Sequence, residues 1–393
     1  MNDGAGVVIV GTGIAGITAA ETLRSAGYPG PVTVLGDEPH LPYRRTALSK
    51  DLLNADLRHD KIRLRKPEFW SERDISIRTG TRVVAVDTGT REIICGDGES
   101  IAYDALVLAT GGRPRTVDAI AAEVPNLRQH DDAVALQRAL ACQPVVIIGG
   151  GLIGLEIAAS AAASTSSVTV LESAPTLLTR VLPAGVAAPL LDLHRANGVQ
   201  IRTGVDIVAA TPETVTTADG SSFGGTVVSA IGMVPNTALA QAVGAEVGPV
   251  GIVVDTELRT TVPHVYAAGD VAARPHPLTG APARAEQWMT ATDHGKLVAA
   301  TVLADSGFDA PEAPPISRVP LAWTIHYSRN MQLAGWPGLA DRVAIDGSVD
   351  DFDATVRCYE GNVLLGGVTL GRPAAGRAMR TEIEQGLQTR VTP

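Results

Sequence analysis

Two sets of three glycines, each followed about twenty residues later by an acidic residue, are the residues whose types and spacing indicate chemistry. The first set is Gly11, Gly13 and Gly16 with Asp37. The first glycine permits a tight turn, the second lets the backbone approach a pyrophosphate, and the third lets a helix pack closely on a strand. The carboxylate accepts hydrogen bonds from ribose hydroxyl groups, and the phosphates lie at the helix N-terminus. The set predicts a dinucleotide site.

The second set repeats this pattern later in the chain, as Gly149, Gly151 and Gly154 with Glu172. A single G-x-G-x-x-G is weak evidence, because glycine-rich turns after strands are common. Two complete sets, each with its strand and its acid, are strong evidence. Two sites imply two dinucleotides, and therefore electrons passed from one to the other.

The glycines and acids need strands and helices to position them, and the sequence around each set provides both. Apolar runs at residues 7–10 and 145–148 lead into the glycines, and runs at residues 32–35 and 168–171 lead into the acids. Alanine-rich stretches between the runs indicate helices. Such continuous apolar runs are typical of strands in a parallel sheet that is buried on both faces. The sequence therefore predicts an α/β fold with two Rossmann-like dinucleotide-binding domains.

The two domains are interleaved along the chain. Apolar runs at residues 105–108 and 227–231, each followed by a glycine turn, close the two units. A further strand is predicted at residues 265–268, and its periodicity assigns it to the first domain. A proline cluster from Pro311 to Pro320 predicts a linker, after which alternating residues with turns at 345–348 and 360–362 indicate a small C-terminal α+β domain. The predicted boundaries are 1–112 with 232–312, then 113–231, then 313–393.

Composition narrows the class of protein. Of the 393 residues, 45% are hydrophobic and 19% are charged, a composition that suits buried parallel sheets. The net charge of −10 disfavours nucleic acid as a partner. No apolar run approaches the length of a membrane span. No leader pattern precedes the first strand, so we expect a cytoplasmic protein. Cys95, Cys142 and Cys358 lie far apart and indicate neither a metal site nor a disulfide framework.

Together these motifs resemble the FAD-dependent pyridine-nucleotide oxidoreductases. The chain is most similar to the NADH-dependent ferredoxin and rubredoxin reductases of oxygenase systems, a branch that includes apoptosis-inducing-factor-like proteins. Residues 42–50, Pro-Tyr-Arg-Arg-Thr-Ala-Leu-Ser-Lys, match the branch pattern P-Y-x-R-P-P-L-S-K with two prolines missing. Residues 127–128, 154–156, 232–236 and 268–270 match further family motifs. The resemblance implies that the first site holds FAD and the second holds NADH.

The resemblance also implies individual roles. Lys50 and Glu156 match a buried catalytic pair that flanks the isoalloxazine ring, the alternative being two unrelated solvated charges. Glu38 is expected to be solvated and Arg44 to be a surface charge, and Trp288 fits the core as well as it fits the flavin. The residues expected to bind the cofactors are Gly11, Gly13, Ala15, Gly16, Asp37, Arg45, Lys50, Val83, Ala109, Thr110, Gly111, Arg128, Gly151, Ile153, Gly154, Glu172, Gly232, Asp270, Glu286, Trp288 and Trp323.

Two further features concern the electron donor and the electron acceptor. Glu172 would repel a 2′-phosphate, and no basic residue follows before Arg180, so NADH is expected over NADPH. The stretch where disulfide reductases of this fold carry a redox cysteine pair contains no cysteine. The redox relay is therefore expected to end at the flavin, with the acceptor arriving from outside. The basic run at residues 58–66 is expected to be a solvated face, or else a site that steers an acidic ferredoxin.

One segment departs from the family. Residues 320–327 occupy the place of the pattern P-W-F-W-S-D-Q, and only Pro320 and Trp323 match. We expect Thr324, Ile325 and His326 to form a turn on the acceptor side of the flavin, with a histidine that titrates near neutral pH.

The predicted function is an FAD-dependent NADH oxidoreductase that passes electrons to a ferredoxin- or rubredoxin-type carrier. One alternative is a flavin dehydrogenase or oxidase that uses a quinone, oxygen or a metabolite. The other is an apoptosis-inducing-factor-like NADH-binding protein that signals through its redox state.

Overall fold

The computed structural model describes residues 5–50, 52–140, 143–164, 167–178, 181–308 and 317–391. The cluster members Pro311, Pro314 and Pro315, as well as Cys142 and Arg180, lie outside these residues. The chain forms two compact units. The first unit comprises Met1–Arg44, Arg58–Arg113 and Val234–Arg318, and the second comprises Arg45–Leu57, Pro114–Met233 and Val319–Pro393. Residues 45–57, which we assigned to the first domain, lie in the second unit. The predicted domain boundaries near residues 112, 231 and 312 stay a prediction.

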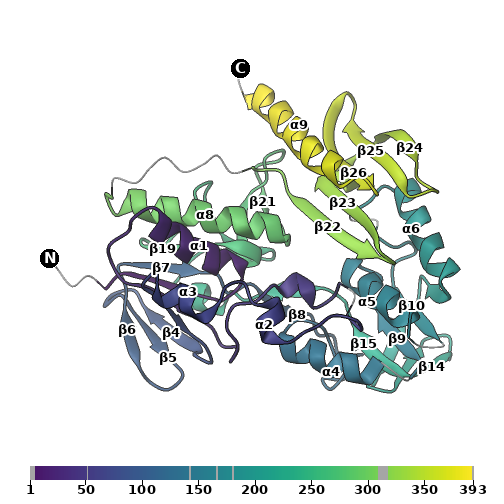
Figure 1. Ribbon diagram of the computed structural model, residues 1–393, viewed down its shortest axis with the longest axis horizontal. Helices are drawn as coiled ribbons and strands as arrows, with labels where there is room; N and C mark the ends of the chain where they lie inside the picture. The colour runs from purple at the N-terminus through teal and green to yellow at the C-terminus, as the bar shows by residue number, and fades with distance from the viewer. Residues whose placement is uncertain are drawn as a thin grey trace. The chain divides into compact units, whose positions relative to one another are not determined.

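A five-stranded parallel sheet forms the centre of the first unit (Figure 1). The strands lie in the order β19 (Val265–Ala267), β7 (Ala105–Leu108), β1 (Val7–Val10), β2 (Val32–Leu35) and β3 (Ile75–Arg78). All of β1 and β7 is buried, as continuous apolar runs predict for strands covered on both faces. Because β19 pairs with β7, the assignment of this late strand to the first sheet is confirmed.

Helices α1 (Ile14–Ser25) and α8 (Trp288–Asp305) pack against each other and lie side by side in Figure 1. Gly295 permits their close approach, because a Cβ atom at this position would lie 2.5 Å from the carbonyl oxygen of Ala15. This packing fixes the N-terminus of α1, where the first glycine set lies.

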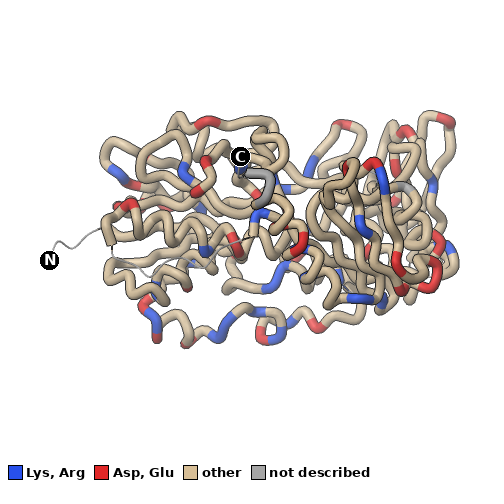
Figure 2. The backbone as a smooth tube through the Cα atoms, turned by 90° about the horizontal axis from the view of Figure 1, so that it is seen from above, with Lys and Arg blue, Asp and Glu red and all other residues tan. Residues whose placement is uncertain are grey.

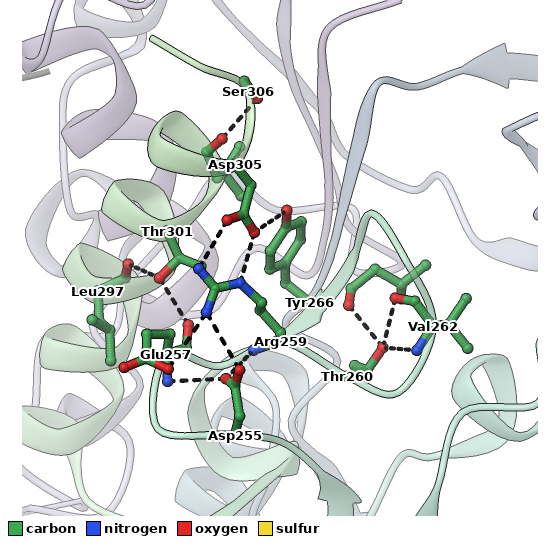
Figure 3. Close-up of polar contacts among 12 residues, drawn as sticks. Asp255, Glu257, Arg259, Thr260, Val262, Tyr266, Leu297, Thr301, Asp305 and Ser306 are labelled. Carbon is green, nitrogen blue, oxygen red and sulfur yellow. Dashed lines mark hydrogen bonds and ion pairs between the residues drawn. The ribbon is translucent and has the colours of Figure 1, made fainter. Parts of the chain in front are cut away.

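The C-terminal end of α8 is held by a polar network (Figure 3). Arg259 donates from Nε and Nη2 to the two carboxylate oxygens of Asp305, each at 2.8 Å, and the Tyr266 hydroxyl donates to the same carboxylate at 2.9 Å. Thr301 donates to the Glu257 carbonyl oxygen at 2.8 Å. A bidentate arginine–carboxylate pair is among the stronger polar contacts in proteins, so it ties α8 to the segment before β19.

The first unit is completed by smaller elements around the parallel sheet. An antiparallel sheet consists of β4, β5 and β6. A mixed sheet consists of β17, β18, β20 and β21, in which β18 runs parallel to β20. The bounds are α2 (His59–Ile62), α3 (Pro67–Ser71), β4 (Val83–Asp87), β5 (Glu92–Cys95), β6 (Ser100–Ala102), α7 (Ala238–Ala242), β17 (Val247–Gly248), β18 (Gly251–Val253), β20 (Ala272–Pro275) and β21 (Pro282–Ala283). Strands β8 (Gly112–Pro114) and β16 (Met233–Pro235) lie where the chain passes from one unit to the other.

The basic run at residues 58–66 is interspersed with acidic partners. Arg65 pairs with Glu21 through two hydrogen bonds of 3.0 Å, and Lys61 lies 3.7 Å from Asp60. Figure 2 shows basic and acidic residues dispersed together over the backbone. This mixture supports the interpretation of residues 58–66 as a solvated face.

The second unit contains a parallel sheet of the same kind. Its order is β11 (Val199–Arg202), β10 (Val168–Leu171), β9 (Val145–Ile148) and β15 (Thr226–Ser229). Helix α5 (Leu152–Ala162) follows β9 as α1 follows β1. The other elements before residue 319 are α4 (His130–Leu140), α6 (Ala184–Ala196), β12 (Ile207–Ala210), β13 (Thr214–Thr217) and β14 (Ser222–Gly224).

The C-terminal part of the second unit is an antiparallel sheet covered by one helix, α9 (Pro373–Val391). Its strands, in spatial order, are β22 (Leu321–His326), β23 (Arg329–Gly335), β26 (Val363–Leu370), β25 (Asp353–Glu360) and β24 (Arg342–Ser348). The predicted turn at 360–362 connects β25 to β26. The turn predicted at 345–348 is wrong, because those residues lie in β24 and pair with β25.

The predicted fold class, α/β with two Rossmann-like domains and a small C-terminal α+β domain, is confirmed. Among the residues that the structure describes, no helix combines the length and the apolar character needed to cross a bilayer.

Candidate functional site

The first glycine set forms a cradle at the N-terminus of α1. Gly11 has a φ of +126°, and a Cβ atom there would lie 2.1 Å from the Ala109 carbonyl oxygen. A Cβ atom at Gly16 would lie 2.1 Å from the Gly11 carbonyl oxygen, so both positions require glycine. Next to Gly13, by contrast, the described residues leave open space. Helix α1 starts without a side-chain cap or an acidic residue in its first turn, so its N–H groups are available to an anion.

The second glycine set repeats this geometry at the N-terminus of α5. Gly149 has a φ of +105°, and its Cβ atom would lie 2.5 Å from the Ala230 carbonyl oxygen, while one at Gly154 would lie 2.1 Å from the Gly149 carbonyl oxygen. Gly151 faces open space within the described part of the chain, and α5 also begins without a side-chain cap. Both cradles therefore fit a pyrophosphate, the group that FAD and NADH share.

The acid of the second set is already oriented. Glu172 is half-buried and accepts hydrogen bonds from the backbone N–H groups of Gly150, at 2.8 Å, and Ala174, at 2.9 Å. These bonds hold the carboxylate at the edge of the glycine cradle, where a ribose would lie.

The acids of the first set differ from each other. Asp37 is exposed just beyond the end of β2, and its contact with a ligand stays a prediction. Glu38 is 7% exposed and accepts a hydrogen bond of 2.6 Å from the Tyr43 hydroxyl. The prediction that Glu38 is solvated is therefore wrong: Tyr43, from the segment that matches the family, supplies the hydrogen bond that makes its burial possible.

The turn after β7 is tied to the family motif at residues 232–236. The Thr110 hydroxyl donates to the Asn236 carbonyl oxygen at 2.8 Å, and the Asn236 side-chain amide donates to the Thr110 carbonyl oxygen at 3.0 Å. The Asn236 backbone N–H donates to the Gly111 carbonyl oxygen at 2.9 Å. Asn236 thus fixes the turn of Ala109, Thr110 and Gly111.

A buried histidine that the sequence analysis did not single out supports Asp270. Asp270 lies in the short 3-10 turn that follows β19, and the Gly269 N–H at the start of this turn donates to Nδ1 of His294 at 3.2 Å. Burial, with a smaller contribution from Arg274, lowers the pKa of His294 to about 3, so the ring is neutral and can accept. Because Asp293 and Lys296 flank it, the local sequence carried no signal that would have distinguished His294 from a solvated residue.

Arg45 and Arg128 lie together. Nη1 of Arg45 donates to the Arg128 carbonyl oxygen at 2.6 Å, and the Arg128 N–H donates to the Asp132 carboxylate at 2.9 Å. Arg44 is exposed and donates to the Lys61 carbonyl oxygen at 2.8 Å. The structure therefore brings together two of the residues predicted to bind FAD, while the exposed position of Arg44 agrees with its predicted role as a surface charge.

The other predicted contacts lie in varied surroundings. Glu286 is exposed and pairs with Arg284 at 2.5 Å. Of the other residues predicted to bind the cofactors, Ala15 and Val83 are buried, Gly232 and Ile153 are exposed, and Trp288 and Trp323 are half-buried. Their contacts to cofactors stay predictions.

Lys50 and Glu156 form a buried ion pair, with Nζ 2.6 Å from Oε1 and with 17% and 3% of the two side chains exposed. Two hydroxyl groups complete the shell of the carboxylate. Ser49 donates to Oε2, and Thr324 lies 2.6 Å from Oε1. Three donors, one of them cationic, stabilise an ionised carboxylate in a buried place.

The segment 324–326 is not a turn, which corrects our prediction. It lies inside strand β22, where Thr324 and His326 are fully buried and Ile325, on the opposite face, is half-buried. Burial lowers the pKa of His326 to about 4, with the Leu155 carbonyl opposing this shift and Lys50 adding to it. His326 is therefore neutral near pH 7, and the expectation that it titrates there is wrong.

Comparison with known families agrees with this geometry. The family model described as pyridine nucleotide-disulphide oxidoreductase matches residues 5–295, and one described as reductase C-terminal matches residues 321–392.

Individual relatives are similar along nearly the whole chain. Rhodocoxin reductase of Rhodococcus erythropolis is 34% identical over 396 residues, covering 96% of this chain and 90% of the relative. The ferredoxin–NAD(+) reductase component of the p-cumate 2,3-dioxygenase system of Pseudomonas putida is 33% identical over 389 residues, covering 96% and 93%. Among solved structures, the covalent putidaredoxin reductase–putidaredoxin complex matches with a TM-score of 0.89 at 32% identity, covering 97% of this chain and 93% of the other.

Proposed function

The chain belongs to the pyridine nucleotide-disulphide oxidoreductase family, and we propose that it is an NADH-dependent FAD reductase that supplies single electrons to a ferredoxin- or rubredoxin-type carrier of an oxygenase system. The observation that carries the proposal is the repeated cradle: two helix N-termini with open glycines, each beside an acid. Relatives of similar length that are named ferredoxin–NAD(+) reductases support the acceptor class. The cytoplasm, which contains NADH, is the location we propose.

The residues of the chain have distinct tasks in this reaction. When bound, FAD accepts two electrons as hydride and returns them singly. The N–H groups at Gly13 and Gly151 bind the phosphates of FAD and NADH, and Asp37 and Glu172 hold the ribose hydroxyl groups. We propose that the Lys50–Glu156 pair, whose likeness to the family's pair is the basis for this role, serves the flavin ring.

The described cysteines support an external acceptor. Cys95 and Cys358 are both buried, and burial raises the pKa of each thiol, that of Cys358 to about 12. A buried thiol that stays protonated is a poor redox group. This agrees with a redox relay that ends at the flavin.

Stepwise kinetics test the proposal. FAD-loaded protein should be bleached by NADH under anaerobic conditions, and it should reduce cytochrome c quickly only when a ferredoxin or rubredoxin is added. Turnover with quinone or oxygen that needs no carrier would instead support a small-molecule acceptor. Air-stable reduced protein with slow turnover under all conditions would support the signalling alternative.

A further inference from the structure

Strand β24 forms one edge of the C-terminal sheet of the second unit (Figure 1). Its inner side pairs with β25 along the whole strand, and no strand in the described part of the chain pairs with its outer side. All of its residues except the last, Ser348, are exposed. An edge strand presents unpaired backbone N–H and C=O groups, which can pair with a strand of another molecule.

The middle of β24 is apolar. Val343 and Ile345 are 40% and 50% exposed, although the residues opposite them on β25, Cys358 and Val356, are 0% exposed. Residues directly opposite each other share a face of the sheet, and Cys358 and Val356 belong to a core cluster of the second unit. The apolar face of the sheet therefore continues to its open edge. The strand contains neither lysine nor proline, which soluble proteins commonly place on an edge to block pairing.

Two copies of β24 can pair with each other in only a few registers. In an antiparallel pair, two opposite residues either exchange hydrogen bonds or both direct their backbone groups away from each other. Because these groups alternate along a strand, opposite residues of two identical strands must both be odd-numbered or both be even-numbered. The two-fold axis that relates the copies therefore passes beside a single residue, and residues 343 to 346 are the central candidates.

The register centred on Ala344 matches every side chain in the middle of the strand. It places Arg342 opposite Asp346 of the second copy and Val343 opposite Ile345, and the symmetry repeats each pair. Centring on Asp346 would place two copies of this carboxylate opposite each other. Centring on Val343 or Ile345 would leave Asp346 without an opposite charge. The sequence of β24 is thus complementary to itself about Ala344.

Both charged residues are accessible for this pairing. Arg342 is exposed, lies 4.2 Å from the centroid of the Tyr359 ring and donates from Nη2 to the Gly361 carbonyl oxygen at 3.1 Å. The side chain of Asp346 is 75% exposed and accepts from Arg372 at 2.8 Å through Oδ2. Because a guanidinium has five N–H donors and a carboxylate accepts several hydrogen bonds, neither contact saturates its group. Both charges lie on the face opposite the apolar pair.

We propose that β24 is a self-association edge, at which two copies of this chain pair antiparallel about Ala344 and join their C-terminal sheets into one. The outward backbone groups then pair, the valine and isoleucine side chains cover one another, and two arginine–aspartate pairs fix the register. One strand pair buries less than the about 1,600 Å² of a typical specific interface, so we expect a weak dimer with a Kd on the order of 10 µM. The inference goes beyond the proposed function and does not depend on it.

Sedimentation of the full-length, FAD-loaded protein tests the edge over concentrations from about 1 µM to about 200 µM. The wild type should change from monomer to dimer across this range. Ile345→Lys places a charge in the apolar cluster twice in each dimer, so it should raise the Kd on the order of 100-fold. Val208→Lys is the matched control and should keep the wild-type Kd, because Val208 is 51% exposed on another edge strand, β12.

Mixing two charge variants tests the register. Arg342→Glu makes both charges of the edge acidic, and Asp346→Lys makes both basic, so each variant alone should stay monomeric because like charges oppose each other. An equimolar mixture should form a dimer, because an acidic edge then meets a basic one. Thermal unfolding of each variant establishes that it is folded, and a mixture that stays monomeric although both variants are folded contradicts this register.

Disulfide formation gives a second measure of the register. Ala344→Cys should crosslink two copies under mild oxidation, because directly opposite Cα atoms lie about 4.5–5.5 Å apart, within the range of a disulfide. Val343→Cys should not exceed the wild-type background, because its two copies are diagonal neighbours about 7–8 Å apart. Equal crosslinking of the two variants would contradict pairing about Ala344.

Two further results would overturn the self-association edge. The first is a wild type that stays monomeric at every concentration. The second is an equal dimer Kd for the wild type and Ile345→Lys. If Ile345→Lys leaves self-association unchanged and slows electron transfer to an added ferredoxin instead, the edge serves the electron carrier and the second copy is the wrong occupant.

Discussion

The Thr324 hydroxyl lies 2.6 Å from the Glu156 carboxylate, although the two residues are 168 positions apart in the sequence. Thr324 stands where the family pattern has a serine, so this substitution keeps the hydroxyl that the carboxylate needs. Ile325, which replaces an aspartate, points to the opposite face of β22 because side chains alternate along a strand. The departure from the family pattern therefore leaves the shell of Glu156 intact.

The two glycine cradles should separate by mutation. Gly13→Ala and Gly151→Ala each add a methyl group in open space, so both proteins should fold with wild-type thermal stability. Gly13→Ala should weaken FAD binding, and Gly151→Ala should raise the Kd for NADH while FAD stays bound, because a Cβ atom keeps the pyrophosphate from the helix N-terminus. Flavin absorbance of the purified proteins and NADH titration measure the two effects. Loss of FAD from both variants alike would contradict separate sites.

Glu172 should set the preference for NADH. Its carboxylate would repel a 2′-phosphate, so Glu172→Ala together with Ser173→Arg should shift flavin reduction toward NADPH. Stopped-flow reduction with each coenzyme gives the ratio, and Ser173→Arg alone is the matched control. A wild-type enzyme that reacts equally fast with both coenzymes would refute this role.

Lys50 and Glu156 should behave as one unit. Removing either partner from the pair leaves a buried charge without its counter-charge, which costs about 3–5 kcal/mol when burial is complete. Lys50→Met and Glu156→Gln should each lower the free energy of unfolding, and the double variant should lose less than the sum of the two. Denaturant titration of the wild type, the two single variants and the double variant gives the coupling energy of the pair by a double-mutant cycle. Additive, negligible effects would show two independent surface charges.

Acid should destabilise the protein below about pH 6.5 through its buried histidines. Burial lowers the pKa values of His194, His294 and His326 to about 3, 3 and 4. The unfolded chain binds these protons as the pH falls below 6.5 and the folded chain does not, so the stabilisation is complete above pH 6.5 and is lost toward pH 3. The free energy of unfolding therefore falls by about 1.4 kcal/mol for each histidine and each pH unit below 6.5, until the pKa of the folded state is reached.

Urea unfolding at about pH 7.5 and about pH 5.5 measures this slope, because few carboxylates titrate between these values. His194→Asn should reduce it, whereas the same change at the exposed His264 should not. An unfolding free energy that does not change between the two pH values would contradict buried neutral histidines.

The sequence alone determined the two cradles and the sheets that position them. Gly11 needs its positive φ, and a glycine at position 16 is needed for close packing of helix on strand, so residue type and spacing encode both features locally. Buried strands such as β1 and β9 are recognisable because a parallel sheet covered on both faces requires continuous apolar runs.

Only the tertiary structure decided which buried polar groups meet. Glu38 with Tyr43, Gly269 with His294, and Glu156 with Thr324 are pairs that no local pattern specifies. The last contact depends on how β22 packs beside α5, and shifting that strand by one residue would turn Ile325 toward Glu156 instead of Thr324. The hydrogen bonds of a buried carboxylate are set by distant segments, because the chain must first fold to bring its partners into reach.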